Sequence, residues 1–257
     1  MNREEWIRTL RRLGWLALLF LVAGLVISAI ENKEATLING IVIDIEPLSD
    51  SSLLIKETDI LNSIDRSFGF SLDGRPLKTL DVTRVERVLE EDPLILDADV
   101  FVDAKNIVHI NIDQRKPMVR IIDRNGLNYY LDKTGVKMPL SRHFTTRVLV
   151  ATGSIAPHVD DFLERDEHRL KQVYDLAHLL LADDFFSAMI EQIHLEEDGD
   201  LILVPLVGDQ RIILGPYEDV PRKLSNLKIF YQEAMPYEGW RTYRTINLKF
   251  KGQVVCK

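Results

Sequence analysis

An uncharged run of eighteen residues near the amino terminus, Leu13 to Ile30, constrains the fold of this chain more than any other feature. As a helix rising about 1.5 Å per residue it reaches roughly 27 Å, close to the thickness of the hydrocarbon core of a bilayer. The flank before the run is mainly basic, and the flank after it is mainly acidic. We therefore predict a cytoplasmic tail at residues 1–12, a single transmembrane helix at residues 13–30 and a folded ectodomain beyond the membrane.

A cleaved secretory signal has the same order of charges and is the main alternative to a retained anchor. The apolar core of such a signal is usually about 7–15 residues long, which is shorter than this run. The stretch Ile27-Ser28-Ala29 is also a poor version of a small-x-small cleavage site. A buried core helix fits less well, because the run is apolar on every side. These observations favour the retained anchor.

The charge of the chain divides at the same place. Residues 1–30 carry four arginines and two glutamates, a formal charge of +2, which leaves −10 for residues 31–257 within the total of −8. An acidic domain is a poor match for nucleic acid or for a surface of anionic lipid head groups. Cys256 is the only cysteine, so no disulfide can form within the chain. The fold must therefore be held together by its core.

Residues 31–117 have the pattern of a short polar link followed by a small α+β domain. Apolar side chains at helical spacing predict two helices, and Thr83 and Glu86 have the spacing of a capping box in the second. Alternation predicts strands, with Leu96 and every second residue after it on the inner face. This order predicts one sheet with both helices on one face. The expected elements are a strand at 41–45, helices at 57–70 and after Asp81, and strands at 96–102 and 108–112.

Residues 118–257 are richer in strands and predict a second domain with a helix and a strand at its carboxyl end. Turns at Asn125-Gly126, Thr134-Gly135 and Asp198-Gly199 separate several of the segments. The expected elements are strands at 118–122, 128–131, 147–151, 190–195, 201–207, 210–214 and 245–251, and helices at 165–181 and 221–233.

Residue patterns typical of an enzyme are missing from the sequence. The six histidines show no HExxH or other close spacing of metal ligands, and no Walker, GxGxxG or GxSxG motif occurs. The acidic pairs Asp160-Asp161 and Asp183-Asp184 stand at predicted helix starts, where they suit capping. We therefore expect no catalytic residue, no metal, no cofactor and no small-molecule substrate. A catalytic triad assembled from distant residues stays open.

The last predicted strand, Thr245 to Lys251, has the features of a binding edge. A terminal strand often lies at the edge of a sheet, where its free backbone groups can accept a partner's strand. The preceding helix would flank the resulting groove. The alternative, in which the strand only completes the core, stays equally open. The residues expected to contact a partner are Ile246, Asn247, Leu248, Lys249, Phe250 and Lys251 of the strand, and Lys223, Leu227, Phe230 and Tyr231 of the helix.

Several stretches resemble, in order and spacing, those of the FtsQ/DivIB family of bacterial cell-division proteins. No single motif is specific, but the resemblance covers roughly residues 10–252. The stretches are Asp73-Gly74-Arg75-Pro76-Leu77 before the second helix, Gln114-Arg115-Lys116-Pro117 between the domains, the hairpin from Asn125 to Gly135 with its Tyr129-Tyr130-Leu131-Asp132 core, Leu214-Gly215 with Lys223-Leu224, and Ile246-Asn247-Leu248-Lys249-Phe250.

This resemblance implies a POTRA domain (β-α-α-β-β) at about residues 37–117 and a β domain at about 118–252. It also implies a non-catalytic divisome scaffold that binds the FtsL–FtsB pair and helps control septal peptidoglycan synthesis. Such a protein is anchored in the inner membrane at the division septum, with its ectodomain in the periplasm. The family uses an arginine and an aromatic residue of the last strand to contact FtsB, and Lys249 and Phe250 occupy those positions. Lysine cannot form the two-pronged pair of arginine, so this contact is altered.

Two other functions remain as rivals. A POTRA-bearing envelope protein would handle extended peptide substrates, although this chain is too short to contain the usual downstream barrel. A membrane-tethered cell-wall enzyme would need a deep pocket with convergent polar groups.

Overall fold

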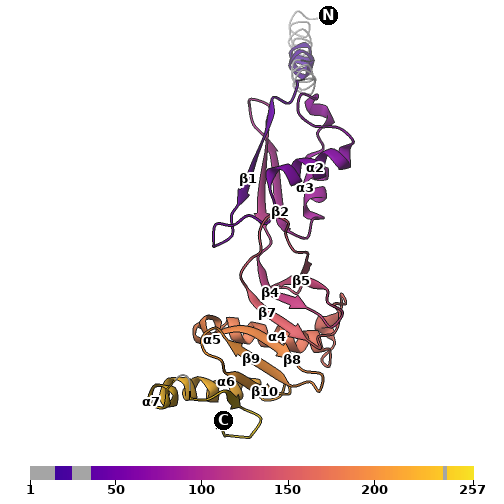
Figure 1. Cartoon of the computed structure of the whole chain (residues 1–257). Helices are drawn as coiled ribbons and strands as arrows, with labels where there is room; N and C mark the ends of the chain where they lie inside the picture. Colours follow the sequence, from indigo (N-terminus) through magenta and orange to yellow (C-terminus); the bar gives the residue numbers. More distant parts are fainter. Residues whose placement is uncertain (1–14, 25–35, 240–241) are drawn as a thin grey trace, which may run out of the picture. The chain divides into compact units, whose positions relative to one another are not determined.

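The computed structural model describes residues 15–24, 36–239 and 242–257, and the chain divides into two compact units (Figure 1). Unit 1 comprises the residues up to Glu46 together with Lys56–Asp113, and unit 2 comprises Pro47–Ile55 and Gln114–Lys257. The boundary therefore falls just before the expected residue 117. The segment Pro47–Ile55 belongs to unit 2, and within this unit the Leu54 amide donates to the Gln114 side chain at 2.5 Å.

The predicted membrane segment is described only in part. Residues 15–24 form an apolar helix whose side chains are exposed. No helix among the described residues is both long enough and apolar enough to cross a membrane. The predicted tail at residues 1–12, and residues 13–14 and 25–30 of the predicted helix, lie outside the described residues.

Unit 1 has the element order that the sequence predicts: strand, helix, helix, strand, strand. The strands form a sheet of order β1-β3-β2, in which β1 runs parallel to β3. The buried faces of both helices and of β2 and β3 supply its core, which includes Ile60, Val85 and Ile110. The elements are β1 Gly40–Glu46, α2 Glu57–Phe68, a 3-10 turn Leu77–Thr79, α3 Val82–Glu90, β2 Ile95–Val102 and β3 Ile107–Gln114.

The start of α3 differs from the prediction. Its cap is Asp81, whose carboxylate accepts a hydrogen bond from the Arg84 amide at 3.0 Å. The expected Thr83–Glu86 capping box is therefore wrong. Glu86 instead accepts a hydrogen bond from the amide of Val100 on β2, at 3.1 Å.

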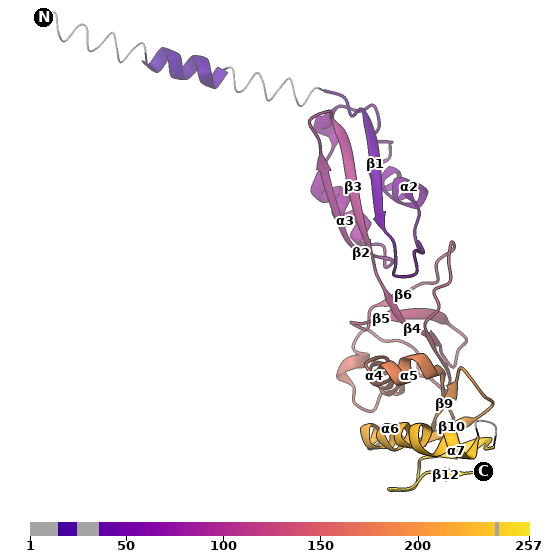
Figure 2. The same cartoon turned by 90° about the vertical axis from the view of Figure 1, so that its left-hand side faces the viewer.

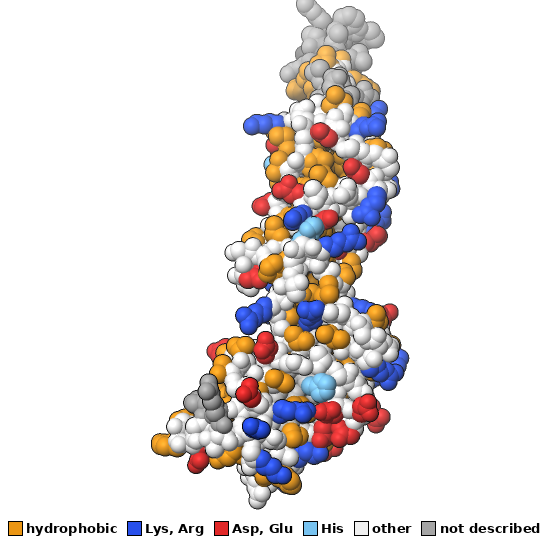
Figure 3. Space-filling view, viewed as in Figure 1, with side chains coloured by type: hydrophobic (Ala, Val, Ile, Leu, Met, Phe, Trp, Pro, Cys, Tyr) orange, Lys and Arg blue, Asp and Glu red, His pale blue; other side chains and the backbone are white. Residues whose placement is uncertain are grey.

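The inner face of β2 also begins one residue earlier than expected. Ile95 is buried, whereas Leu96 is 54% exposed. The Ile95 amide bonds to the Asp92 carbonyl in the turn that follows α3, which fixes Ile95 against the helices. Two consecutive exposed residues follow before the alternation resumes at Ala98. Hydrophobic side chains appear among the charged ones on the face of this unit seen in Figure 3.

Unit 2 is built on a nine-stranded mixed sheet of order β12-β11-β10-β9-β8-β7-β4-β5-β6. Strands β4, β7 and β8 are parallel neighbours, and β10 and β11 form a second parallel pair. The strands are β4 Pro117–Ile122, β5 Asn128–Asp132, β6 Lys137–Met138, β7 Leu149–Gly153, β8 Ile190–Leu195, β9 Leu201–Pro205, β10 Arg211–Gly215, β11 Thr245–Asn247 and β12 Val255–Cys256.

The helices of unit 2 lie on one side of this sheet (Figure 2). Their apolar residues join those of the strands in one core, in which Phe162, Leu176 and Leu227 are at most 1% exposed. Pro221 lies in the first turn of α6, as the sequence predicts. The helical elements are a 3-10 turn Phe162–Glu164, α4 Arg169–Leu181, α5 Asp184–Met189, α6 Val220–Ile229, a π turn Phe230–Ala234 and α7 Met235–Glu238.

Candidate functional site

The last predicted strand is much shorter than expected. The sequence predicts Thr245–Lys251, but β11 ends at Asn247. The Asn247 side chain accepts a hydrogen bond from the Lys249 amide at 2.9 Å, which turns the backbone out of the ladder. A further turn follows, in which the Gln253 amide bonds to the Phe250 carbonyl and Gly252 takes a φ of 71°. The chain then reverses and adds one more strand.

That additional strand, β12, replaces β11 as the end of the sheet. It pairs antiparallel with β11, placing Cys256 opposite Ile246 and Val255 opposite Asn247. On its other side β11 pairs parallel with β10. The expectation that Thr245–Lys251 is the edge strand is therefore wrong, because the chain covers that edge itself.

The outer edge of β12 carries backbone groups that point away from the sheet. Lys257 and Thr245 exchange two backbone hydrogen bonds of 3.0 Å each, so Lys257 faces inward. Successive residues of an antiparallel strand alternate in direction, so the N–H and C=O of Cys256 face outward. In the part of the chain that the structure describes, no strand pairs with this edge. It is an open position for an additional strand.

An apolar surface adjoins this edge. The rings of Phe230 and Tyr243 lie 6.2 Å apart and pack, half-buried, against the core together with Cys256. Burial raises the pKa of the Cys256 thiol, which suits an apolar side chain rather than a reactive one. Phe250, in the turn that leads to β12, is 53% exposed. This end of unit 2 therefore combines open backbone groups with exposed apolar area.

Half of the predicted contact residues are buried in unit 2 itself. Lys223 is 9% exposed, and its ammonium donates to the Pro216 carbonyl at 3.0 Å. The others are within the core, because α6 and β11 turn their apolar faces toward the same cluster. These buried residues are Ile246, Leu248, Leu227, Tyr231 and Lys223.

Lys249 is held by the chain rather than left for a partner. Its ammonium donates to the Asp200 carboxylate at 2.6 Å, and this hydrogen bond raises the pKa of Lys249 above its ordinary value. Its stem lies over Gly215, where an added Cβ would come within 2.7 Å of the Lys249 Cγ atom. Of the predicted residues, Asn247 and Phe230 are half-buried, and Phe250 and Lys251 are exposed.

Sequence reasoning missed β12 and the Tyr243 beside it. A strand of two residues is too short to show alternation. The available signal was weaker: Lys251-Gly252 marks a turn, and Val254-Val255-Cys256 is a short apolar run after it.

Three of the residues considered as catalytic or metal-binding, Asp161, His168 and Asp183, have local structural roles. Asp183 caps α5 by accepting from the Phe185 amide, and Asp161 pairs with Arg165. The His168 ring nitrogen caps α4 by accepting from the Leu170 amide at 3.3 Å. Among the described residues, no three His, Cys, Asp or Glu side chains gather in a way that could hold a metal ion.

Comparison with known proteins then identifies the family. Residues 116–257 match the family model described as "FtsQ/DivIB, C-terminal related". The chain belongs to the FtsQ/DivIB family. It is also similar to the cell division protein FtsQ of Rhodothermus marinus, with 28% identity over 189 residues that cover 72% of this chain and 68% of that relative. The matched family region contains the whole nine-stranded sheet, including the open edge at β12. The name of this relative states that it is a cell division protein.

Proposed function

We propose that this chain is a non-catalytic division scaffold that binds other divisome proteins by strand addition at the outer edge of β12. The observation that carries the proposal is this edge, where the N–H and C=O of Cys256 face outward beside the apolar surface of Phe230 and Tyr243. The family membership of the chain supports a role in division.

The proposed partner is the FtsL–FtsB pair, and the proposed consequence is control of septal peptidoglycan synthesis. The residues 13–30 would anchor the chain in the inner membrane, with both units in the periplasm at the septum. Unit 1 would be the POTRA domain, which its β-α-α-β-β order supports.

The size of the edge limits what the backbone alone contributes. Each hydrogen bond between strands adds only about 0.5–1.5 kcal/mol net, and β12 offers few such groups. Burial of a large apolar side chain adds about 1.5–3 kcal/mol when it is complete. Contacts with Phe230, Tyr243 and Phe250 therefore supply much of the affinity, and the backbone bonds fix the register.

The two rival functions have less support. In unit 1 the Glu86 carboxylate already bonds the Val100 amide of β2, which disfavours addition of a peptide strand at that place. For an enzyme, a hollow of about 810 Å³ in unit 2 lies where parallel strands begin. In open α/β sheets, ligands bind outside the carboxyl ends of the strands instead.

Titration calorimetry tests the proposal on the full chain, held in an uncharged detergent, with the joined FtsL–FtsB ectodomains of the same organism. Cys256→Pro removes the outward N–H, while Cys256→Ser keeps it and serves as the matched control. We expect saturable binding that weakens at least about tenfold in the proline variant and stays within about twofold in the serine variant. Equal affinity of the proline variant would show that β12 is not the binding edge, and no binding by the parent chain would reject these partners.

A further inference from the structure

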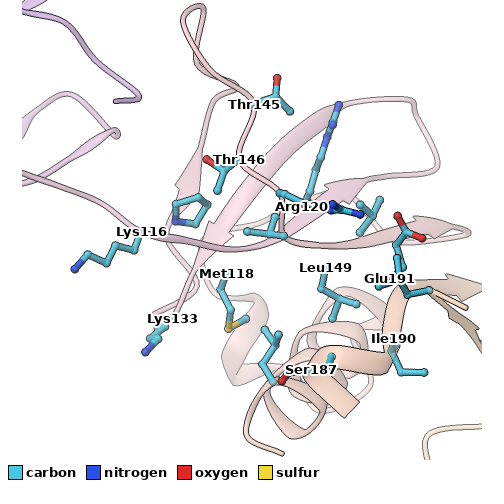
Figure 4. Close-up of a pocket in the computed structure, with 17 residues that line it drawn as sticks. Lys116, Met118, Arg120, Lys133, Thr145, Thr146, Leu149, Ser187, Ile190 and Glu191 are labelled. Carbon is cyan, nitrogen blue, oxygen red and sulfur yellow. The ribbon is translucent and has the colours of Figure 1, made fainter. Parts of the chain in front are cut away.

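A groove of about 810 Å³ lies in unit 2 where β4, β7 and β8 begin (Figure 4). These strands are parallel neighbours, so their amino ends meet at one end of the sheet. The floor is apolar and consists of Met118, Leu149 and Ile190, which are 8%, 6% and 6% exposed. Part of α5 and the exposed Leu206 also line it. The groove involves none of the residues of the β12 edge.

Four cations line this groove: Lys116, Arg120, Lys133 and Arg147. Figure 4 shows Lys116 and Lys133 at one end and Arg120 at the other, with Met118 and Leu149 between them. Glu191 is the only acidic residue among those that line it, so the local formal charge is +3. A positive groove is unusual for a chain whose total charge is −8.

The groove cations differ from other cations of unit 2 in their partners. Seven lysines and arginines elsewhere in the unit pair with a carboxylate of the chain. None of the four groove cations forms such a pair with a described residue. Arg120 donates through Nε to the Asn128 side chain at 2.9 Å, which orients its guanidinium without neutralising it. Solvated cations are common on surfaces, but four around one apolar floor repel one another and attract an external anion.

One wall of the groove offers unpaired backbone groups. The wall segment, residues 145–148, leads into β7 and makes no backbone hydrogen bond with any other described residue. The Oγ1 atom of Thr146 is buried and has no hydrogen-bond partner among the described residues. An unsatisfied buried hydroxyl costs about 1–3 kcal/mol, so a ligand that bonds it would gain affinity.

We propose that this groove binds an extended acidic peptide segment of a partner protein. The apolar side chains of the peptide lie on Met118, Leu149 and Ile190, and its carboxylates pair with the four cations. The peptide backbone forms hydrogen bonds with residues 145–148. This is a second binding surface, separate from strand addition at β12. A lipid head group or an anionic sugar would satisfy the cations, but neither has the regular donors and acceptors that match an open backbone segment.

The test uses the full chain in an uncharged detergent and a fluorescein-labelled peptide of about twelve residues, in which glutamate alternates with leucine and valine. Binding is followed by fluorescence anisotropy. The groove variant is Lys133→Glu with Arg147→Glu. The matched control is Arg124→Glu with Arg142→Glu, which changes the net charge equally at exposed residues outside the groove.

We expect saturable binding that the groove variant weakens about tenfold or more and the control changes less than about twofold. Raising the salt from about 50 mM to about 500 mM should weaken it further, because the pairs are partly exposed. Binding to the FtsL–FtsB pair should persist in the groove variant, since β12 is untouched. If the glutamate variant loses its folded circular dichroism spectrum, Lys133→Gln with Arg147→Gln replaces it.

Three results would overturn the proposal. The first is the absence of saturable peptide binding by the parent chain. The second is an equal loss of binding in the groove variant and the control, which would indicate only overall charge. The third is binding to vesicles containing phosphatidylglycerol, dependent on Lys133 and Arg147, without binding of the peptide. That result would assign the groove to lipid head groups.

Discussion

The two units treat the ends of their sheets differently. In unit 1 a carboxylate from α3, that of Glu86, bonds the Val100 amide of β2, so part of that strand is satisfied from within. In unit 2 the last strand, β12, turns the backbone groups of Cys256 outward, and residues 145–148 leave theirs open at the groove. Both sheets also keep an edge strand that pairs on one side only, β1 in unit 1 and β12 in unit 2. The matched family region, residues 116–257, contains β12 and not β1, which favours partner binding on unit 2.

The histidines of the two units lie in different surroundings. His109 of unit 1 lies on the solvent side of its sheet, 3.3 Å from the Asp103 carboxylate and stacked on Phe101. His158 and His168 of unit 2 pack against Phe162 with ring centroids at 5.3 and 6.3 Å. Protonation of His158 or His168 would place a charge within this aromatic cluster. Acid should therefore weaken unit 2 at the cluster.

The largest expected effect comes from truncating the centre of that cluster. Phe162→Ala removes a side chain that is 1% exposed and should lower the free energy of unfolding of unit 2 by about 3–5 kcal/mol. Native-state hydrogen exchange of the full chain measures β8 and β3 separately. We expect faster exchange in β8 with β3 unchanged, and Ile110→Ala should show the reverse. Equal acceleration in both strands for either variant would mean that the units do not unfold independently.

A smaller loss is expected when the buried Asp132 is neutralised. Burial pushes the pKa of this carboxyl up, but hydrogen bonds from Arg115 and Thr134 outweigh it and hold the pKa below the usual range. Asp132→Asn should cost about 2 kcal/mol in urea unfolding, since the Arg115 guanidinium, 2.8 Å away, loses its carboxylate.

The direction of the pKa shift predicts how the contribution of Asp132 to stability depends on pH. Because the folded-state pKa of Asp132 lies below the unfolded value, its contribution is present above about pH 4 and is lost as the pH falls further. The matched control is Asp123→Asn, in a similar turn whose carboxylate accepts only backbone amides in the described structure. Asp123→Asn should lower the free energy of unfolding by less than Asp132→Asn does. An equal loss would contradict the role of Arg115.

Acid should weaken unit 2 through His158 and His168. Burial lowers the pKa of both rings, and protonation of His168 would also remove the acceptor that caps α4. Because the unfolded chain binds these protons more readily, stability falls as the pH drops through about 6.5. Unfolding midpoints between about pH 7 and pH 5 check this, and His158→Gln with His168→Gln should flatten the slope. A slope that the double variant leaves unchanged would contradict it.

The smallest effect is expected at Lys249. Lys249→Met keeps the stem over Gly215 and removes only an exposed ion pair with Asp200, so stability should barely change. Affinity for the FtsL–FtsB pair should also be retained, because the ammonium is already engaged. A marked loss of affinity with unchanged stability would restore Lys249 as a direct contact.

Sequence patterns anticipated the parts of the fold that depend on regular periodicity. The alternation of Val108, Ile110 and Ile112, all at most 1% exposed, predicts the inner face of β3 correctly. Patterns failed where a single side chain or a distant contact decides the structure. The Asn247 side chain ends β11 by accepting a hydrogen bond from the Lys249 amide. The two residues of β12 form a strand through their pairing with β11, which no local pattern shows.

Distant contacts also explain two features of unit 2 that the sequence analysis did not predict. The contacts of Pro47–Ile55 with this unit include a hydrogen bond between Leu54 and Gln114, sixty residues apart, and one from the Ser141 hydroxyl to the Leu54 carbonyl. The groove cations come from separate segments that only the sheet brings together. Neither arrangement leaves a local pattern that a window of residues can reveal.

Hydrogen–deuterium exchange of the full chain, with and without the FtsL–FtsB ectodomains, tests strand addition at β12 most directly. The opposite edge of the same sheet, β6, is the internal control. The account predicts slower exchange at residues 254–257 and no change at Lys137–Met138 in the complex. Protection at β6 or at β1 of unit 1, with residues 254–257 unchanged, would contradict it.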